Sequence, residues 1–288
     1  MSNVNATAAT APKPTRPVMR YHGGKWRLAP WIIEHFPPHR VYSEPFGGAA
    51  SVLMRKPRCY SEVYNDLSED VWNVFRVLRE ARQDLEEALR ATPFSRTEYE
   101  LAKGPVADDP VERARRTILR SHQGFGSASY LRTHSTGFRA TALRSGTAPA
   151  QDWKTFPQHL EAFQERLRGV ALENRKAEAV LRATDSARTL HYLDPPYVAS
   201  ARSTHEDTYE HEMSAGDYAG LAEVLRELEG MVVLSGYDCD LMQELFSSWK
   251  QVRRQAFASS QNAGTTRTEC LWLNPTAQRR QRQQNLFD

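Results

Sequence analysis

Short apolar runs alternate with longer amphipathic stretches along most of this chain of 288 residues. Residues 41–44 and 61–65 are candidates for two short strands, and a glycine turn after the first leads into a helix at residue 51. Beyond the second strand, apolar side chains recur at helical spacing and predict one long helix. Those side chains are Leu67, Val71, Val74, Leu78, Leu85 and Leu89.

The same alternation returns in the second half of the chain. Helices are expected at 159–168, 177–183, 217–228 and 240–246, strands at 169–172, 189–193 and 231–235, and a terminal strand pair at 251–258 and 268–273. Alternating strands and helices indicate a parallel sheet that is covered on both faces. We therefore predict an α/β fold with a doubly wound, mostly parallel sheet.

The alternation is interrupted between residues 92 and 158. Pro, Gly, Ser and Arg occur there without a sustained period, and only 110–121 is predicted to be helical. We interpret 92–158 as an inserted domain between two parts of one core, 18–91 and 159–275. Residues 1–17 are expected to form a disordered leader, and the polar tail 276–288 to be disordered apart from its end.

The composition is that of a globular protein, with 40% hydrophobic and 25% charged residues. The sequence shows no signal peptide and no membrane-spanning stretch. Cys59, Cys239 and Cys270 are far apart and form no C-x-x-C pair, so neither a disulfide framework nor a zinc site is predicted. These features favour a reducing, cytoplasmic setting.

The strongest chemical motif is Asp194-Pro195-Pro196-Tyr197, directly after the apolar run 189–193. The carboxylate of Asp194 and the carbonyl of Pro195 can each accept a hydrogen from an exocyclic amine. Tyr197 can stack on a planar ring, and the prolines hold the turn rigid. The motif therefore indicates chemistry on an amine of a planar base, against the alternative of an ordinary loop with a Pro-Pro corner.

Two other predicted strands end in acids. Glu44 precedes the turn Pro45-Phe46-Gly47-Gly48, and Asp66 follows the next strand. Ligands of open parallel sheets bind beyond the carboxyl ends of the strands. Glycines let the backbone approach a ligand closely, and an acid there can accept hydrogen bonds from a ribose diol. A nucleoside cofactor is predicted, although turn geometry alone also explains the glycines.

The segment Tyr21-His22-Gly23-Gly24-Lys25 is a further candidate for ligand binding. It does not fit a P-loop, because Trp26 stands where Ser or Thr is required. A lysine after two glycines suits a ligand carboxylate, and the aromatic face of Tyr21 attracts cations. Carboxylate, sulfonium and ribose together describe S-adenosylmethionine.

In this order the motifs resemble those of the Dam-type, site-specific DNA adenine-N6 methyltransferases, over about residues 20–275. The similar segments are 21–25 and 44–48 for the cofactor, 64–66 for the ribose-binding acid, 194–197 for catalysis, and 235–237 and 268–274 for the late motifs. The resemblance implies the catalytic residues Asp194, Pro195, Pro196 and Tyr197. It implies the cofactor-binding residues Tyr21, Gly23, Gly24, Lys25, Glu44, Pro45, Phe46, Gly47, Gly48, Asp66 and Asp194.

The resemblance also implies a methyltransferase fold with an inserted, mainly helical target-recognition domain. The amine of a flipped-out adenine would attack the methyl group of S-adenosylmethionine directly, without a metal or a covalent enzyme intermediate. The chain departs from the family at one place. Lys176 stands near the position where relatives carry an acid for the cofactor's adenine, and Glu173 and Glu178 are candidate replacements.

Arginines gather in the predicted insertion. Seven of them lie between Val111 and Arg144, against the single acid Glu112, and aromatic residues are interleaved with them. Such a cluster indicates contact with a phosphate backbone, although a solvated helix face is the usual alternative. The residues predicted to contact DNA are Arg116, Arg120, Arg132 and Arg139, with Tyr130 as a wedge.

Two remaining motifs have competing interpretations. His205-Glu206 and His211-Glu212 invite a metal site, but their spacing favours a mobile polar loop over the active site. The C-terminal residues Gln283, Leu286 and Phe287 resemble peptides that dock into bacterial sliding clamps, and folding back on the domain is an equal alternative.

Two other functions compete with DNA methylation. An RNA adenine methyltransferase would share the catalytic motif, but the insertion between core motifs favours DNA. A cofactor-sensing DNA-binding protein without turnover would account for the lysine at position 176.

Overall fold

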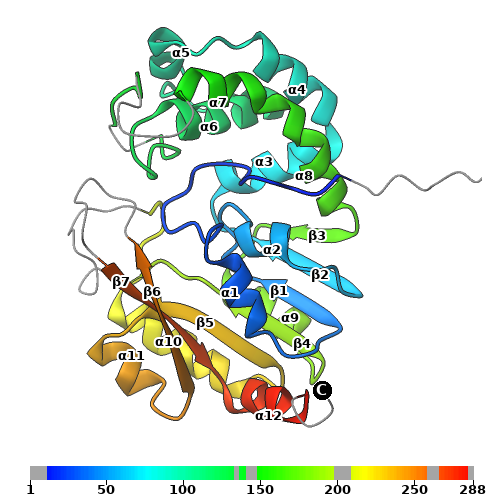
Figure 1. Cartoon of the computed structure of the whole chain (residues 1–288), viewed down its shortest axis with the longest axis vertical. Coiled ribbons are helices and arrows are strands. Elements are labelled where there is room, and N and C mark those ends of the chain that lie inside the picture. The colour runs from blue at the N-terminus through cyan, green and yellow to red at the C-terminus, as the bar shows by residue number, and fades with distance from the viewer. Residues whose placement is uncertain (1–11, 133–135, 141–147, 198–208, 258–265, 285–288) are drawn as a thin grey trace, which may run out of the picture.

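The computed structural model describes residues 12–132, 136–140, 148–197, 209–257 and 266–284. Its centre is a seven-stranded sheet with the order β3-β2-β1-β4-β5-β7-β6 (Figure 1). The strands are β1 (Val41–Glu44), β2 (Ser61–Asn65), β3 (Val170–Glu173), β4 (Thr189–Leu193), β5 (Met231–Tyr237), β6 (Lys250–Phe257) and β7 (Thr266–Leu273). Strands β1 to β5 pair in parallel, and β7 runs antiparallel between β5 and β6. The mostly parallel sheet predicted from the sequence is confirmed.

The strand order reverses between β1 and β4. The chain first runs outward from β1 to β2 and β3, and then returns to β4 and β5 on the other side of β1. Crossovers between parallel strands are right-handed, so connections that run in opposite directions lie on opposite faces of the sheet. The reversal therefore makes the sheet doubly wound and opens a crevice at the carboxyl ends of β1 and β4.

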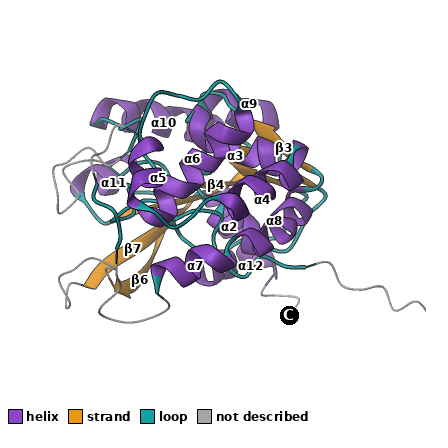
Figure 2. Ribbon diagram, turned by 90° about the horizontal axis from the view of Figure 1, so that it is seen from above, coloured by secondary structure: helices purple, strands orange, loops and turns teal. Residues whose placement is uncertain are grey.

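Helices connect the strands, and some of them gather beyond one edge of the sheet. They are α1 (Ala29–Glu34), α2 (Ser51–Arg55), α3 (Glu69–Glu80), α4 (Arg82–Ala91), α5 (Arg96–Leu101), α6 (Pro110–Gln123), α7 (Pro149–Thr155), α8 (Leu160–Leu167), α9 (Ala177–Thr184), α10 (Ala215–Glu227), α11 (Asp240–Leu245) and α12 (Pro275–Gln284). Figure 1 shows α4 to α7 together beyond the β3 edge, and Figure 2 looks down on this helical layer. No helix among the described residues is both long and apolar enough to cross a membrane.

The period of two in the strands divides the core between the two faces. In β5, Met231 and Val233 pack into a cluster that also contains α1, α2, α3 and α8. Val232 and Leu234, the alternate residues of the same strand, pack with α9, α10 and α11 on the other face. All four side chains are fully buried, which explains why this strand has a continuous apolar sequence.

The single long helix predicted after the second strand is wrong. The structure has two helices, α3 and α4, which meet at Ala81 with φ −139° and ψ 43°. Leu67 precedes both and is 44% exposed. Ser68 starts α3 by accepting a hydrogen bond from the backbone N–H of Val71, and the acids of the first turn complement the helix dipole. Capping therefore placed the helix start two residues later than the apolar spacing indicated.

Other local predictions also need correction. The segment 92–158 contains α5 and α7 in addition to α6. Residues 276–284 of the predicted disordered tail belong to α12, whereas Leu286 and Phe287 of the predicted clamp peptide lie outside the described residues. Ala277 anchors α12 because its side chain is fully buried. Within the predicted disordered leader, Arg16 lies 3.0 Å from Asp152 and over the ring of Phe156. These contacts tie residue 16 to the helical layer.

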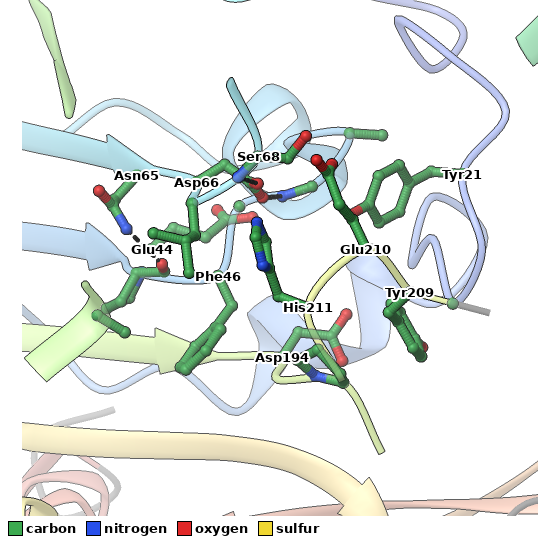
Figure 3. A pocket seen from close by; sticks show the side chains of 18 of the residues that line it. Tyr21, Glu44, Phe46, Asn65, Asp66, Ser68, Asp194, Tyr209, Glu210 and His211 are labelled. Atoms are coloured by element: carbon green, nitrogen blue, oxygen red, sulfur yellow. Dashed lines mark hydrogen bonds between the residues drawn. The ribbon is translucent and has the colours of Figure 1, made fainter. Parts of the chain in front are cut away.

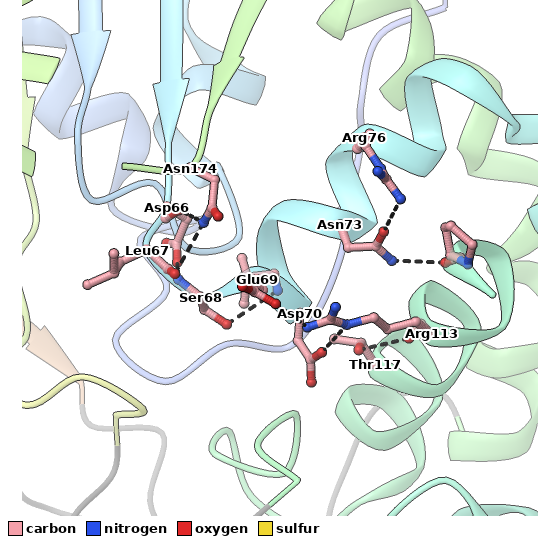
Figure 4. A network of polar contacts seen from close by, with 12 residues as sticks. Asp66, Leu67, Ser68, Glu69, Asp70, Asn73, Arg76, Arg113, Thr117 and Asn174 are labelled. Carbon is pink, nitrogen blue, oxygen red and sulfur yellow. Dashed lines mark hydrogen bonds and ion pairs between the residues drawn. The ribbon is translucent and has the colours of Figure 1, made fainter. Parts of the chain in front are cut away.

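Ion pairs hold the helical layer onto the core (Figure 4). Asp70 in the first turn of α3 accepts hydrogen bonds from Arg113 at 2.6 Å and from Arg120 at 3.1 Å, both on α6. The side chain of Asn73 donates to the carbonyl of Pro110, the first residue of α6. Since α3 begins three residues after Asp66, this network joins the insertion to the carboxyl edge of the sheet. The domain boundaries at 92 and 158 stay a prediction.

Candidate active site

A cavity of about 300 Å³ lies at the carboxyl ends of β1, β2 and β4, where the strand order reverses. Segments from five parts of the chain line it, at residues 21–25, 44–49 with 51–52, 65–68, 175–178 and 209–213, together with Tyr192, Asp194, Pro196 and Asp217. Every residue predicted to bind a cofactor lies on this wall. The strand ends bring them together although they are up to 173 positions apart in the sequence, from Tyr21 to Asp194.

The turn after β1 needs its two glycines for space. A Cβ at Gly47 would stand 2.1 Å from the ring of Tyr64, and one at Gly48 would stand 2.7 Å from the ring of Tyr21. Gly48 also has a φ of +48°, which favours glycine. The turn can therefore press its backbone against two aromatic rings at the cavity wall.

Asp66 closes this turn from the neighbouring strand. Its carboxylate accepts hydrogen bonds from the backbone N–H groups of Gly48 at 2.7 Å and Ser68 at 2.8 Å. Burial raises the pKa of Asp66 to about 6, and these two hydrogen bonds oppose the rise. Each oxygen keeps a lone pair that can accept a hydrogen bond from a ligand hydroxyl.

Glu44 is the most deeply buried acid at the cavity, with 2% of its surface exposed. One oxygen accepts hydrogen bonds from the hydroxyl of Tyr42 at 2.7 Å and from the backbone N–H of Leu53 at 3.0 Å. Burial raises its pKa from the ordinary value of 4.5 to about 8, and the charge of Asp194 adds to the rise. This carboxyl therefore holds its proton at neutral pH unless a cation comes close.

Lys25 lies against Asp194. Its ammonium is 3.0 Å from the Asp194 carboxylate and donates to the carbonyl of Gly23 at 2.8 Å. The sequence predicted that Lys25 would meet a ligand carboxylate, whereas the structure pairs it with the predicted catalytic acid. Burial raises the pKa of Asp194, and the ion pair opposes that rise, which favours an ionised acceptor next to the cavity.

The rest of the catalytic motif surrounds Asp194. Pro195 is buried, and Pro196 lines the cavity, where its carbonyl accepts a hydrogen bond from Tyr218. Tyr197 is 5% exposed and is not among the residues that line the cavity, and the Lys25 ammonium lies 4.7 Å from its ring centroid. The ring is therefore held by neighbouring side chains on several sides.

Residues 209–213 reach the cavity from the chain beyond the catalytic motif. Figure 3 shows His211 in the space between Asp66 and Asp194, and Glu210 also lines the cavity. The sequence placed His211 and Glu212 in a polar loop over the active site but named no contact there. His205 and Glu206 lie outside the described residues. Within the described part of the chain, no group of three His, Cys, Asp or Glu side chains could hold a metal ion.

The structure distinguishes the two candidate replacements for the missing acid. Lys176 and Glu178 line the cavity, whereas Glu173 is not among the lining residues. The turn that carries them is pinned by Asn65, whose side chain exchanges hydrogen bonds with the backbone of Arg175 at 2.9 and 3.0 Å. Glu178 therefore stands on a rigid support at this end of the cavity.

Comparison with known proteins identifies the family. Residues 21–259 match the family described as D12 class N6 adenine-specific DNA methyltransferase. The chain belongs to this family. It is also 25% identical over 273 residues to the DNA adenine methylase of Escherichia coli strain K12, covering 88% of this chain and 92% of that protein. The DNA adenine methylase of E. coli O157:H7 matches to the same extent.

The resemblance seen in the sequence motifs is thus confirmed, and the doubly wound sheet is that of an S-adenosylmethionine-dependent methyltransferase. Among solved structures, an rRNA methylase from Streptococcus thermophilus aligns with 90% of this chain and 97% of its own. Its TM-score is 0.35 and its identity 10%, so this likeness carries no argument about function.

Two of the residues predicted to contact DNA are structural in this methyltransferase. Arg120 is 3% exposed and donates to Asp70 and to the carbonyls of Tyr130 and Ala102. Tyr130 is 2% exposed, and its ring stacks on Tyr21 at 4.4 Å. Neither side chain is available to a nucleic acid, so both predictions are withdrawn. Packing across the insertion buries them, which the arginine and aromatic pattern could not show.

The other candidates differ in exposure. Arg116 is paired with Glu112 at 2.6 Å and donates to the carbonyl of Pro105. Arg132 is exposed and Arg139 is half-buried. Phe125 is 52% exposed in the same arginine-rich segment, where its N–H donates to the carbonyl of Gly137. Phe125, rather than Tyr130, is the aromatic side chain presented to solvent there.

The raised pKa of Glu44 predicts a pH-dependent stability difference between wild type and Glu44→Gln. Between pH 4.5 and 8 the unfolded chain releases this proton while the folded protein keeps it, so wild type loses stability as pH rises. Glutamine stays neutral and can accept both hydrogen bonds. The free energy of unfolding of the variant relative to wild type should therefore rise from pH 5 to pH 8, by at most about 1.4 kcal/mol per pH unit. A difference that stays constant over this range would show that Glu44 is ionised in the folded protein.

Proposed function

We propose that this protein is a site-specific DNA methyltransferase that moves a methyl group from S-adenosylmethionine to N6 of a flipped-out adenine. One observation carries the proposal: a single cavity at the strand reversal joins Glu44, Asp66 and the glycine turn to Asp194. Family membership supports the substrate and the reaction. An enzyme acting on chromosomal DNA fits the predicted cytoplasmic setting.

The cavity suits a cationic nucleoside. Its wall carries the carboxyl groups of Glu44, Asp66 and Asp194, and the space at Gly47 and Gly48 admits no side chain. Asp66 would accept hydrogen bonds from the ribose diol, and Glu44 would face the charged amino-acid part. When bound, S-adenosylmethionine supplies an electrophilic methyl group on its sulfonium.

Asp194 and Pro195 act on the target amine. The ionised Asp194 and the Pro195 carbonyl accept the two amine hydrogens, which directs the nitrogen lone pair away from the ring and toward the cofactor. Lys25 favours the ionised form of Asp194 against the effect of burial and holds the carboxylate in one orientation. The catalytic contribution is then positioning together with fixed dipoles.

Methyl incorporation tests the reaction and its central residue together. Tritium from labelled S-adenosylmethionine should enter unmethylated duplex DNA and be recovered as N6-methyladenine. Asp194→Asn keeps the shape but exchanges one acceptor for a donor, and transfer should fall at least about 1,000-fold. Transfer to RNA alone would show that RNA, and not DNA, is the substrate. Cofactor binding without transfer to any nucleic acid would show that the protein is a cofactor sensor and not an enzyme.

We propose that Arg132, Arg139 and Phe125 face the DNA. Arg132→Ala should weaken binding to duplexes of any sequence and reduce the slope of log K against log salt by about 1, because one phosphate contact is lost. Arg116→Ala is the matched control, since Glu112 already neutralises that side chain. Fluorescence anisotropy at several salt concentrations measures the salt dependence of DNA binding for wild type and both variants. An equal slope for wild type and Arg132→Ala would remove Arg132 from the interface.

We propose that Glu178 replaces the missing acid and accepts the N6 amine of the cofactor's adenine. S-adenosylhomocysteine should then bind more tightly than S-inosylhomocysteine, whose O6 would face the carboxylate. Glu178→Gln should reduce this preference about tenfold or more, the worth of a hydrogen bond to a charged group. Glu173→Gln, the control, should leave it unchanged. Calorimetry measures both ligands, and an unchanged preference in Glu178→Gln would assign the amine to another group.

A further inference from the structure

We propose that Glu269 is a positioning residue for the target adenine and acts through the phenol of Tyr197. The inference rests on the proposed function and on the expectation from the sequence motif that Tyr197 stacks on the flipped base. Sequence motifs placed Glu269 in a late family segment without a role. The structure brings it to the catalytic motif from an antiparallel strand, 72 positions further along the chain.

The phenol of Tyr197 is anchored at its oxygen. It donates a hydrogen bond to the carboxylate of Glu269 at 3.1 Å, and its oxygen lies 3.2 Å from the hydroxyl of Ser235. Burial raises the pKa of Tyr197 well above its ordinary value, and the charges of Glu269 and Asp194 add to the rise. The phenol therefore keeps its proton and remains the donor in this contact.

The sheet determines where Glu269 lies. In the antiparallel pair of β5 and β7, Glu269 is the register partner of Tyr237, and the ring of Tyr237 meets Tyr197 edge-on at 4.4 Å. The antiparallel pairing of β7 with β5 therefore places the Glu269 carboxylate at the active-site edge of the sheet.

These contacts hold the Tyr197 ring in one orientation. The ammonium of Lys25 lies over the ring, Tyr237 contacts it edge-on, and Glu269 fixes the position of the hydroxyl oxygen. The ring is 5% exposed, so a flipped base stacks on it only after side chains that cover it move aside. The anchored hydroxyl keeps the ring in place during that exchange, and displacement of the ring by about 1 Å can cost on the order of 100-fold in rate. Glu269 thus controls the geometry of the transfer without touching the base.

The test compares Glu269→Ala, Glu269→Gln and Tyr197→Phe with the double variant Tyr197→Phe/Glu269→Ala. Thr268→Ala is the control, because this neighbour on β7 is exposed and alternate residues of a strand point to opposite faces. Single-turnover methyl transfer to unmethylated duplex DNA is measured at saturating S-adenosylmethionine. Cofactor affinity and melting temperature are measured on the same samples.

Glu269→Ala is expected to lower the transfer rate about 10- to 100-fold with unchanged cofactor affinity. Glu269→Gln keeps an oxygen acceptor and should stay within about threefold of wild type, a rescue that a general structural role would not produce. The double variant should be no slower than the slower single variant, because both changes remove the same contact.

Three results would contradict the inference: a wild-type rate in Glu269→Ala, additive losses in the double variant, or a loss that follows melting temperature and cofactor affinity. Absence of transfer by the wild-type protein would instead overturn the proposed function. The two failures are therefore distinguishable in one set of measurements.

Discussion

Three carboxyl groups at the carboxyl edge of the sheet, two of them buried and that of Asp194 largely so, impose the main constraint on this structure. Each leaves water on folding and needs compensation from nearby donors. Glu44 receives a phenol and a backbone N–H, Asp66 receives two backbone N–H groups, and Asp194 receives the ammonium of Lys25. The glycine turn, the start of α3 and the N-terminal segment all take the positions that supply these donors. The same local structures that build the cavity wall therefore also stabilise the carboxyl groups inside it.

The helical layer is tied to the same edge by two routes. Asp70, four residues after Asp66, binds Arg113 and Arg120 of α6. Arg120 also holds the carbonyl of Tyr130, whose ring stacks on Tyr21 at the cavity wall. The segment expected to recognise DNA is thus connected to the cofactor cavity through α3 and through a pair of stacked rings. Residues that resemble a DNA-binding cluster in the sequence are used instead to make this connection.

Local chemistry explains which predictions from the sequence held. The strand ends with their acids and glycines could be located because short apolar runs, glycine turns and prolines act within a few residues. The family resemblance arose from the same short motifs and is confirmed by the match over residues 21–259. The break between α3 and α4 was missed because apolar side chains continue at helical spacing across Ala81, and only the backbone reveals the interruption.

By itself, the sequence determined the type of sheet, the order of its motifs and the acids at its strand ends, since each depends on neighbouring residues. Only the tertiary structure decided the partners of those acids. It turned Lys25 toward Asp194, buried Arg120 and Tyr130, and brought Glu269 to Tyr197. These pairings join segments 50 to 169 positions apart, and they follow from strand order and helix packing. The pattern of residue types along the chain does not reveal these pairings, because they depend on which surfaces of the sheet and helices pack together in the folded protein.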